Sequence, residues 1–370
     1  MKTVAAVLHE QGKPWDVVEI DLDPPKDHEV LVRFHAAGLC HSDEHIRSGD
    51  TPTRVPMVGG HEGAGIVEAV GNGVDRVAVG DHVVCSWIPV CGTCRYCQTG
   101  RSNLCNTGMN ITTGTLLDGT HRFHENGQDL GGMCVLGTFS ERAVLSEWSV
   151  TKVPEDVAFD VAALVGCGVT TGWGSAVYAS GVRAGETVVV VGIGGVGINA
   201  VQGARMAGAR DVLAVDPVPF KLEMAVKLGA THTFGDYDQV RETVKELTWG
   251  QGADHVILTV GVMTREVVDF GIELAGKGGT VTITGIPVQG EMTIVQSSAA
   301  ITGWQKRIQG TIFGSANPLY DIPRLLSLYK AGELKLDELI TRRYRLEQIN
   351  EGYQDMLDGK NIRGVIIHDT

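Results

Sequence analysis

The sequence has little positive charge and no long hydrophobic run, and each shortage excludes a class of protein. Its 370 residues include 31 Lys and Arg against 44 Asp and Glu, a formal net charge of −13. An acidic chain without a basic patch is a poor electrostatic match for nucleic acid or an anionic membrane surface. No apolar run approaches the roughly 20 residues that span a bilayer, and the segment before His9 is too short for a secretory signal. We therefore expect a cytoplasmic protein that binds neither nucleic acid nor membrane.

Glycine and cysteine stand out among the residues that are present. The chain has 49 glycines and 8 cysteines, in an otherwise ordinary globular composition with 43% hydrophobic residues. Its length predicts two or three domains. Five of the cysteines lie between Cys85 and Cys105. In a reducing compartment, clustered cysteines favour metal binding or catalysis over disulfides.

The first 150 residues have the pattern of short strands separated by glycine and aspartate turns. Residues 29–38 and 64–71 alternate apolar with small or polar side chains, as half-buried strands do. Residues 76–84 are predicted to form two strand pieces folded about Gly80. This succession of short strands predicts an all-β or barrel-like unit.

From about residue 170 the pattern changes to alternating strands and helices. Residues 186–192 form a continuous apolar run, which is typical of a central parallel strand buried on both faces. The spacing predicts an α/β fold with a doubly wound parallel sheet. Further strands are expected at 211–216, 254–261, 279–285, 307–313 and 363–368, and helices at 219–230, 240–250, 320–331 and 346–358.

A glycine-rich motif follows the first of these strands. Gly192-Ile193-Gly194-Gly195-Val196-Gly197 fits G-x-G-x-x-G, and a helical pattern begins directly after it. In such a motif the first glycine allows a tight turn, the second lets the backbone approach pyrophosphate, and the third allows close packing of helix on strand. The helix N-terminus then offers free N–H groups to the phosphates.

Asp216 lies 19 residues beyond Gly197, at the end of the next predicted strand. A carboxylate at this distance binds the adenosine ribose hydroxyls and would repel the 2′-phosphate of NADP, so the pattern favours NAD. The alternative is a structural strand–helix turn followed by an ordinary surface aspartate.

Four cysteines with regular spacing predict a structural zinc site. The spacing is Cys91-x2-Cys94-x2-Cys97-x7-Cys105, and four thiolates so placed can close a tetrahedron around zinc. An iron–sulfur cluster fits less well, because the fourth cysteine of the bacterial motif follows at a shorter distance and precedes proline. A disulfide knot would require an oxidising compartment.

A second, dispersed set comprises Cys40, His61 and Cys167, each of them flanked by short glycine-containing motifs. Together they could supply the Cys₂His set of a catalytic zinc that keeps one position open for substrate. Taken singly, each has an ordinary interpretation as a buried or surface side chain, and composition alone does not select them.

Six motifs, in order along the whole chain, resemble those of the zinc-dependent alcohol dehydrogenases of the medium-chain dehydrogenase/reductase superfamily. They are GLCHSDEH, GGHEGAG, CGTCRYCQTGRSNLC, GCGVTTGWGSAV, VGIGGVG and NIRGV. The resemblance implies a GroES-like catalytic domain, formed by residues 1–168 and 313–370, around a Rossmann NAD-binding domain at 169–312. It also implies two zinc ions per subunit and a homodimer or homotetramer.

The resemblance assigns Cys40, His61 and Cys167 as the ligands of the catalytic zinc. Glu62 matches a carboxylate beside the zinc, and Asp43 matches the acid that orients the histidine. Alcohol oxidation to an aldehyde or ketone, with hydride transfer to NAD, is the implied reaction.

Other matched residues would move the proton or contact the coenzyme. Ser42 matches the hydroxyl that takes the alcohol proton, and His45 matches the outer base that receives it. The coenzyme contacts are Thr171 and Val196 beside the nicotinamide, Ile286 in the loop covering it, Lys221 at the adenosine ribose, and His41 and Arg363 at the pyrophosphate. His41 stands where many relatives have arginine. Trp87 matches a wall of the substrate pocket, with a plain core tryptophan as the alternative.

Two longer segments indicate a subgroup. NTGMNITTGTLLDGTHRF and ALVGCGVTTGWGSAV resemble the actinobacterial nicotinoprotein alcohol dehydrogenases, which keep NAD bound and have it reoxidised by an external acceptor. The long loop at 118–127 also resembles that of dimeric classes, including glutathione-dependent formaldehyde dehydrogenase, so oxidation of a thiol adduct of formaldehyde is the alternative function. That alternative needs a cation near the pocket, for which Arg122 is the candidate. A non-enzymatic dinucleotide sensor is disfavoured by the retained zinc ligands, and Cys85 and Cys134 are expected to be plain buried cysteines.

Overall fold

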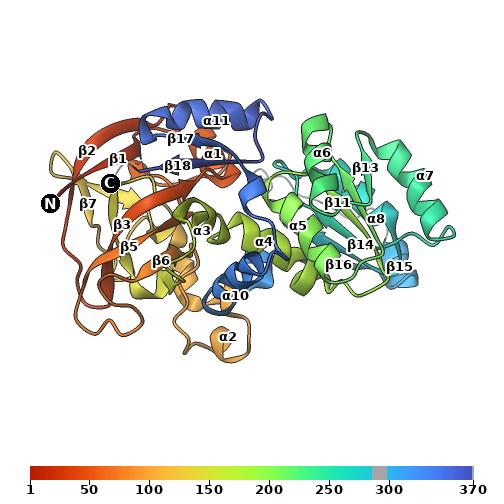
Figure 1. Ribbon diagram of the computed structural model, residues 1–370, viewed down its shortest axis with the longest axis horizontal. Coiled ribbons are helices and arrows are strands. Elements are labelled where there is room, and N and C mark those ends of the chain that lie inside the picture. Colours follow the sequence, from red (N-terminus) through yellow and green to blue (C-terminus); the bar gives the residue numbers. More distant parts are fainter. Residues whose placement is uncertain (286–297, 369–370) are drawn as a thin grey trace. The chain divides into compact units, whose positions relative to one another are not determined.

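The computed structural model describes residues 1–285 and 298–368, and the chain divides into two compact units (Figure 1). Unit 1 comprises Met1–Cys167 and Asn317–Thr370, and unit 2 comprises Gly168–Ala316. Each unit has its own sheets, and the predicted change from short strands to alternating strands and helices falls where unit 2 begins.

Unit 1 contains a closed barrel and a seven-stranded sheet. The barrel order is β1 (Lys2–Leu8), β2 (Asp16–Leu22), β7 (Phe123–Glu125), β8 (Gln128–Gly132) and β4 (Met57–Val58). The sheet order is β10 (Val150–Lys152), β6 (His82–Cys85), β5 (Gly63–Val70), β3 (Glu29–Gly38), β18 (Arg363–Ile367) and β17 (Ile340–Tyr344), and β9 (Arg142–Ser146) also pairs with β3. The predicted barrel-like unit is thus confirmed.

One predicted strand piece in unit 1 is wrong. Strand β3 coincides with the alternating segment 29–38, but of 76–84 only the second piece becomes a strand, β6. The first piece is held as a loop because the Arg76 guanidinium donates to the carbonyl oxygens of Val90 and Cys91, at 2.7 and 3.1 Å. The Asp81 carboxylate also accepts the Ala78 N–H, which closes a turn instead of a strand ladder.

Short helices connect the strands of unit 1. They are α1 (His41–Ser48), α2 (Arg95–Gln98), α3 (Phe159–Val165), α10 (Pro318–Lys330) and α11 (Ile349–Leu357). Single 3₁₀ turns occur at Ser102–Leu104, Met133–Val135, Glu147–Ser149, Asp337–Leu339 and Leu346–Gln348, and a longer 3₁₀ segment occurs at Asn106–Thr112. Helix α1 begins directly after Cys40, and α3 ends two residues before Cys167, so both helices carry a predicted ligand at one end.

Unit 2 is a six-stranded parallel sheet whose strands alternate with helices (Figure 1). The order is β13 (His232–Phe234), β12 (Asp211–Val215), β11 (Thr187–Val191), β14 (Ala253–Leu258), β15 (Ala275–Ile283) and β16 (Arg307–Gly310). The helices are α4 (Gly168–Gly174), α5 (Gly195–Met206), α6 (Pro219–Lys227), α7 (Tyr237–Leu247), α8 (Arg265–Leu274) and α9 (Ser298–Gly303), with a π turn at Ser175–Ser180 and a 3₁₀ turn at Phe313–Ser315. This is the predicted doubly wound sheet, in the order typical of Rossmann domains.

The burial pattern explains why these strands form. Every residue of β11 is buried, as its continuous apolar sequence predicts for a central strand. Helix α6 ends before Gly229, which has φ +116°, a left-handed value that only glycine adopts without strain. Strand β16 ends at Gly310 and is shorter than the predicted 307–313; the Thr311 N–H still donates to the Ile283 carbonyl of β15, and a 3₁₀ turn follows at Phe313–Ser315.

Among the described helices, none is by itself long and apolar enough to cross a membrane. Two consecutive helical segments, Phe159–Val165 and Gly168–Ser180, are together long and apolar enough to span a membrane, but the chain bends between them. Most of their residues are buried, as in the core helices of globular proteins.

Candidate active site and metal centres

Unit 1 brings together four side chains that can bind a metal. One ligand atom from each of Cys40, His61, Glu62 and Cys167 lies within 4.8 Å of all the others. The set fits the two thiolates and one imidazole that a catalytic zinc requires, with a carboxylate as a further oxygen donor. The residue before His61 must be glycine in this backbone conformation. Gly60 has φ +89°, and a Cβ added to it would stand 2.5 Å from the Thr138 hydroxyl. The predicted dispersed ligands are therefore neighbours in space.

Asp43 orients the imidazole of His61. Its Oδ1 lies 3.2 Å from His61 Nδ1 and also accepts the Gly60 N–H at 3.2 Å. Because a carboxylate accepts, Nδ1 carries the proton and Nε2 is left free to bind a metal. Asp43 and His61 are 0% and 2% exposed. Although burial alone lowers it, Asp43, Cys40 and Cys167 together raise the pKa of His61 well above its ordinary value.

The thiols of Cys40 and Cys167 interact directly, and the interaction shifts their pKa values in opposite directions. A hydrogen bond from Cys167 lowers the pKa of Cys40 well below its ordinary value, and the same interaction raises the pKa of Cys167. A divalent cation binds both sulfurs as thiolates and releases such protons. The chemistry of this donor set thus fits zinc.

Glu62 lies between this set and an arginine that is distant in sequence. Its Oε2 accepts a hydrogen bond from Arg363 Nη2 at 2.5 Å, and the same nitrogen donates to the Leu39 carbonyl at 3.0 Å. Oε1 of Glu62 is buried and has no hydrogen-bond partner within the described part of the chain. Burial raises the pKa of Glu62, whereas Arg363 opposes this shift. Arg363, which was expected to contact the pyrophosphate, is 4% exposed, and its guanidinium is bound to Glu62.

Ser42 and His45 lie three residues apart on α1, and therefore share one side of the helix. The Ser42 hydroxyl lies 3.6 Å from Cys40 Sγ. The His45 imidazole contacts the His41 ring at 4.7 Å between centroids, and its Nδ1 lies 3.0 Å from Asp50 Oδ2. The side chain of Asp50 is 41% exposed, so the histidine connects the metal-binding region to a solvated carboxylate. Asp50 was not among the predicted residues.

The four clustered cysteines of unit 1 also lie together. Sulfur–sulfur distances are 3.6 Å for Cys94–Cys97, 3.8 Å for Cys94–Cys105 and 3.5 Å for Cys91–Cys105. Zn–S bonds of about 2.3 Å at tetrahedral angles place the sulfur atoms about 3.8 Å apart, so the cage has the size that zinc needs. Backbone hydrogen bonds from Asn106 and Cys97 lower the pKa of Cys94 to about 6, which favours the thiolate.

In unit 2 the glycine motif forms the turn between β11 and α5. Gly192 has φ +91°, and a Cβ added to Gly197 would stand 1.8 Å from the Gly192 carbonyl oxygen. At Gly194 an added Cβ would meet no atom within 4 Å, so the backbone there is open to a ligand. Helix α5 begins at Gly195 with its N–H groups at this opening. The motif therefore has the geometry of a pyrophosphate site.

Asp216 holds this turn and pairs with a lysine. Its Oδ2 accepts the Ile193 N–H at 2.8 Å, and its Oδ1 accepts the Val218 N–H at 3.0 Å. Lys221 Nζ lies 3.6 Å from Oδ2. The two residues expected at the adenosine ribose are thus neighbours, with Asp216 5% exposed.

The other predicted coenzyme contacts have different placements. Thr171 lies in α4 with its hydroxyl buried and without a hydrogen-bond partner among the residues described, which leaves a polar atom for a ligand. Val196 is the second residue of α5, and its carbonyl would be 2.0 Å from a Cβ added to Gly172. His41 is half-buried at the start of α1, whereas Ile286 lies outside the described residues.

Trp87, Cys85 and Cys134 complete the placement of the predicted residues. Trp87 is partly buried and packs against the hydrophobic core of unit 1. Cys85 is fully buried, and burial raises its pKa. Cys134 is only partly buried, so the expectation of a plain buried cysteine is wrong for this residue. Desolvation nevertheless raises the pKa of its thiol to about 11.

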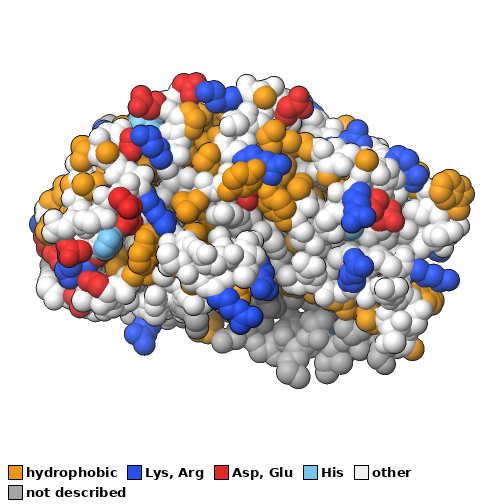
Figure 2. Space-filling view, turned by 90° about the horizontal axis from the view of Figure 1, so that it is seen from below, with side chains coloured by type: hydrophobic (Ala, Val, Ile, Leu, Met, Phe, Trp, Pro, Cys, Tyr) orange, Lys and Arg blue, Asp and Glu red, His pale blue; other side chains and the backbone are white. Residues whose placement is uncertain are grey.

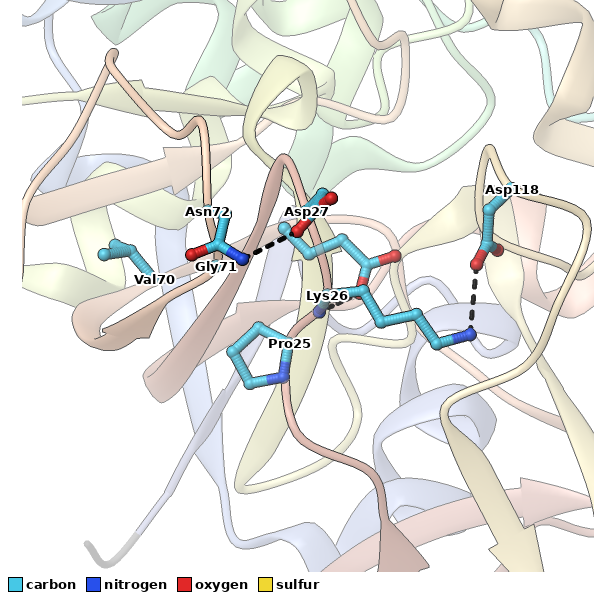
Figure 3. Close-up of a pocket in the computed structure, with 8 residues that line it drawn as sticks. Pro25, Lys26, Asp27, Val70, Gly71, Asn72 and Asp118 are labelled. Atoms are coloured by element: carbon cyan, nitrogen blue, oxygen red, sulfur yellow. Dashed lines mark hydrogen bonds and ion pairs between the residues drawn. The ribbon is translucent and has the colours of Figure 1, made fainter.

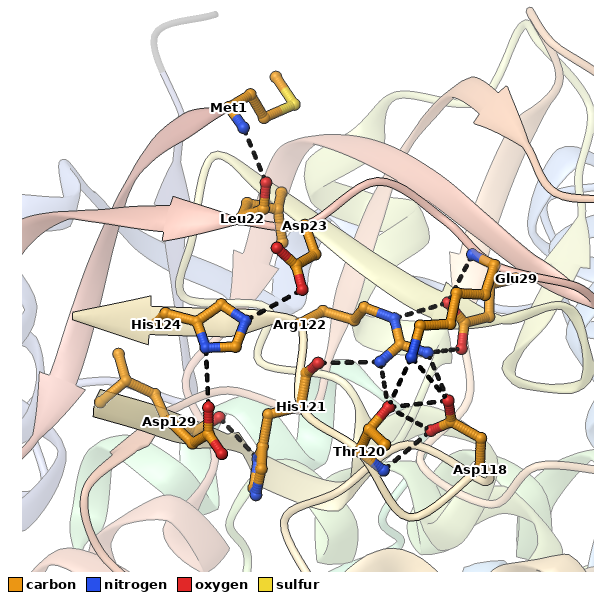
Figure 4. Close-up of polar contacts among 12 residues, drawn as sticks. Met1, Leu22, Asp23, Glu29, Asp118, Thr120, His121, Arg122, His124 and Asp129 are labelled. Carbon is orange, nitrogen blue, oxygen red and sulfur yellow. Dashed lines mark hydrogen bonds and ion pairs between the residues drawn. The ribbon is translucent and has the colours of Figure 1, made fainter. Parts of the chain in front are cut away.

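Arg122, the candidate cation for a thiol cofactor, is instead a buried structural residue (Figure 4). Its side chain is 1% exposed. The guanidinium donates from Nε to Glu29 at 2.8 Å and from Nη2 to Asp118 at 2.8 Å, and it also bonds the other oxygen of Glu29. These bonds occupy the group that a thiol cofactor would need.

A hollow of about 600 Å³ adjoins this cluster (Figure 3). Its polar walls are already paired: the Lys26 ammonium lies 3.2 Å from Asp118, and the Asn72 amide donates to Asp27 at 3.0 Å. None of the metal-binding cysteines or histidines lines it. The hollow therefore has no part in the candidate active site.

Comparison with known proteins gives consistent results. Residues 26–155 match the alcohol dehydrogenase GroES-like domain, and residues 195–331 match the zinc-binding dehydrogenase family. The chain is 59% identical to an NDMA-dependent alcohol dehydrogenase of Amycolatopsis methanolica over 100% of both chains. It is 39% identical to an S-(hydroxymethyl)glutathione dehydrogenase of Synechocystis, over 99% of this chain and 100% of that protein. The crystal structure of benzyl alcohol dehydrogenase from Acinetobacter calcoaceticus superposes with a TM-score of 0.93 at 31% identity, over 100% and 99% of the two chains.

The chain contains a GroES-like unit with two ligand sets for zinc and a Rossmann unit with an NAD motif. Relatives match the chain along its whole length. The chain belongs to the zinc-dependent alcohol dehydrogenases of the medium-chain dehydrogenase/reductase superfamily.

Proposed function

We propose that this alcohol dehydrogenase keeps its NAD bound between turnovers and passes the electrons to an external acceptor. The name of the 59% identical relative, an NDMA-dependent alcohol dehydrogenase, supports this proposal. The substrate is an alcohol, and the product an aldehyde or ketone. The main observation in support of this reaction is that Cys40, His61 and Cys167 lie together with Glu62. One oxygen of Glu62 has no hydrogen-bond partner among the described residues.

Cys40, His61 and Cys167 would hold the catalytic zinc. Bound there, zinc supplies a Lewis acid that lowers the pKa of an alcohol hydroxyl, and the nicotinamide supplies the hydride acceptor. Asp43 keeps His61 in the tautomer with Nε2 free. Cys91, Cys94, Cys97 and Cys105 would fill all four positions of a second zinc, which makes that site structural.

The proton of the alcohol would leave along α1. Ser42, beside the ligand Cys40, would accept it and release its own hydroxyl proton, and His45 would be the base at the end of this path. The solvated Asp50 carboxylate would stabilise the imidazolium of His45 until the imidazolium releases the proton to water. Trp87 would narrow the substrate pocket.

NAD would bind on the turn formed by Gly192, Gly194, Gly195, Val196 and Gly197. Asp216 and Lys221 would bind the adenosine ribose, because they lie 3.6 Å apart beside this turn. A carboxylate there disfavours the 2′-phosphate of NADP. The remaining proposed contacts are Thr171 and Ile286 at the nicotinamide, and His41 and Arg363 at the pyrophosphate.

We also propose the domain boundaries, the oligomeric state and the cytoplasmic location of the enzyme. The compact units divide after Cys167 and Ala316, which supports a catalytic domain of 1–168 and 313–370 and a coenzyme domain of 169–312. Strand β16 ends its sheet with one side unpaired among the described strands, which supports a homodimer or homotetramer. Figure 2 shows both basic and acidic side chains on one face, and the formal net charge of −13 supports a cytoplasmic enzyme that binds neither nucleic acid nor membrane.

The nicotinamide content of protein purified without added NAD tests this proposal. After denaturation and chromatography, we expect about one NAD(H) per chain. The protein should then oxidise an alcohol with a nitroso dye as acceptor and no free NAD. Empty protein that requires free NAD would contradict cofactor retention.

The alternative reaction, oxidation of a thiol adduct of formaldehyde, loses its residue-level support. Arg122 was its candidate cation, and this side chain is buried against Glu29 and Asp118. We expect no stimulation of formaldehyde oxidation by a low-molecular-weight thiol.

A further inference from the structure

One oxygen of Asp43 is not accounted for by the contacts that orient His61. Oδ1 accepts hydrogen bonds from His61 and from the Gly60 N–H. Oδ2 is buried, and among the described residues it has no partner in ordinary hydrogen-bond geometry. Leaving a buried carboxylate oxygen without a donor is costly, so a donor is expected beside it.

Tyr353, on α11, is a buried tyrosine whose polar atom, like Oδ2 of Asp43, is not accounted for. The residue is 2% exposed, and its hydroxyl also lacks a partner of ordinary geometry within the described part of the chain. Its ring packs against two aromatic rings, those of Trp15 and Phe139, with both centroid distances at 6.3 Å. The hydroxyl of a buried tyrosine usually finds a hydrogen-bond partner.

Electrostatic interactions place this hydroxyl beside Asp43. Burial, followed by the Asp43 carboxylate and the Cys40 thiol, raises the pKa of Tyr353 well above its ordinary value. The acidic side chain of Glu44, on the same turn of α1, adds to the shift. Tyr353 and the N-terminal turn of α1 therefore lie close together, and Asp43 is the fully buried carboxylate of that turn.

The aromatic rings around Tyr353 also contact the glycine turn that precedes His61. A Cβ added to Gly59 would stand 2.5 Å from the Trp15 ring, and one added to Gly60 would stand 2.6 Å from Phe139. Trp15 and Phe139 thus pack on Tyr353 on one side and on the backbone before His61 on the other. This packing holds the tyrosine ring in a fixed place relative to Asp43.

We propose that Tyr353 is a positioning residue for the catalytic metal: its hydroxyl donates to Asp43 Oδ2 and fixes the carboxylate that orients His61. The inference rests on the proposed role of His61 as a zinc ligand. With Oδ2 held, the carboxylate cannot rotate, and Oδ1 stays aligned with His61 Nδ1. Groups that orient metal ligands in this way commonly change metal affinity by 10- to 100-fold.

The test compares Tyr353→Phe with the matched control Tyr344→Phe. Tyr344 belongs to the same hydrophobic cluster and is 4% exposed, but its hydroxyl donates to Asp355 at 2.9 Å. Each substitution removes one buried hydroxyl and keeps the ring. The measured quantity is the rate at which the protein releases zinc to excess chelator. From Tyr353→Phe we expect release of the catalytic zinc about 10-fold faster than from the unaltered protein, and from Tyr344→Phe a rate within about twofold of it. The slower zinc of the four-cysteine site should be unaffected in both.

A second measurement uses the fully folded chain. With 3-fluorotyrosine at position 353, the ¹⁹F resonance should shift when chelator removes the catalytic metal, because the hydroxyl is bonded to a group that contacts the ligand His61. An unchanged resonance, or equal release rates in the two phenylalanine variants, would overturn the role of Tyr353. The zinc content of the unaltered protein separates this result from a failure of the proposed function: one zinc per chain would contradict the ligand assignment itself, whereas two zinc ions with equal release would contradict only the role of Tyr353.

Discussion

Replacing Arg122 with methionine should destabilise the protein without affecting its chemistry. The guanidinium is buried at 1% exposure and binds both oxygens of Glu29, which is itself only 7% exposed (Figure 4). Without Arg122, Glu29 would keep its hydrogen bond from the Lys26 N–H, at 2.9 Å, but would have no cation. Breaking one side of a buried ion pair costs about 3–5 kcal/mol. For a domain of roughly 150–250 residues, this corresponds to a loss of roughly 10 °C in melting temperature.

The assay is thermal unfolding followed by circular dichroism, with turnover measured on the folded protein at 25 °C. The double variant Arg122→Met/Glu29→Gln should recover part of the lost stability, because it leaves no unpaired charge behind. Lys26→Met is the exposed control: its ammonium is 54% exposed and pairs with the same Asp118, so its loss should cost under about 1 kcal/mol. Equal melting temperatures for Arg122→Met and Lys26→Met would refute this reasoning, and so would a specific loss of turnover in folded Arg122→Met.

Two further predictions concern the barrel and the coenzyme turn. The hydrogen bond to Glu125, followed by that to Asp16, raises the pKa of His9 despite partial burial. Protonated His9 therefore stabilises the folded protein fully below about pH 6.5, and this contribution is lost as the pH rises through the pKa of His9 in the folded protein. His9→Gln should therefore lower the melting temperature by about 1–2 °C near pH 5.5 and by less near pH 8.5; an equal loss at both pH values would count against this linkage. Gly197→Val should empty the coenzyme site while zinc content is kept, because its Cβ would stand 1.8 Å from the Gly192 carbonyl oxygen; bound nicotinamide at the unaltered level would contradict the position of that site.

Local patterns in the sequence predicted the features that depend on neighbours along the chain. Strand β3 coincides with its alternating segment, and the buried run ending at Gly192 became the central strand β11. The four-cysteine cage was predicted from spacing alone, because its ligands lie within one loop. The error at Arg76 has a tertiary cause, since its side chain binds the carbonyls of Val90 and Cys91 in place of a strand partner.

Contacts between distant segments could not be derived in this way. Arg363 binds Glu62 across 301 positions, and Arg122 binds Glu29 across 93 positions. No periodicity marks such pairs, so the resemblance could place Cys40, His61 and Cys167 in one site but gave no indication that Arg122 would be buried. Tyr353 could not be singled out for the same reason, because α11 and α1 are far apart in the sequence.

The most direct test of the two-zinc account is the metal content and turnover of Cys40→Ser and Cys97→Ser, measured beside the unaltered protein. We expect two zinc ions per chain in the unaltered protein. Cys40→Ser should keep one zinc and nearly the same melting temperature and lose turnover, whereas Cys97→Ser should keep the catalytic zinc and melt at a lower temperature. Two zinc ions and undiminished turnover in Cys40→Ser would contradict the assignment of the catalytic metal to Cys40, His61 and Cys167.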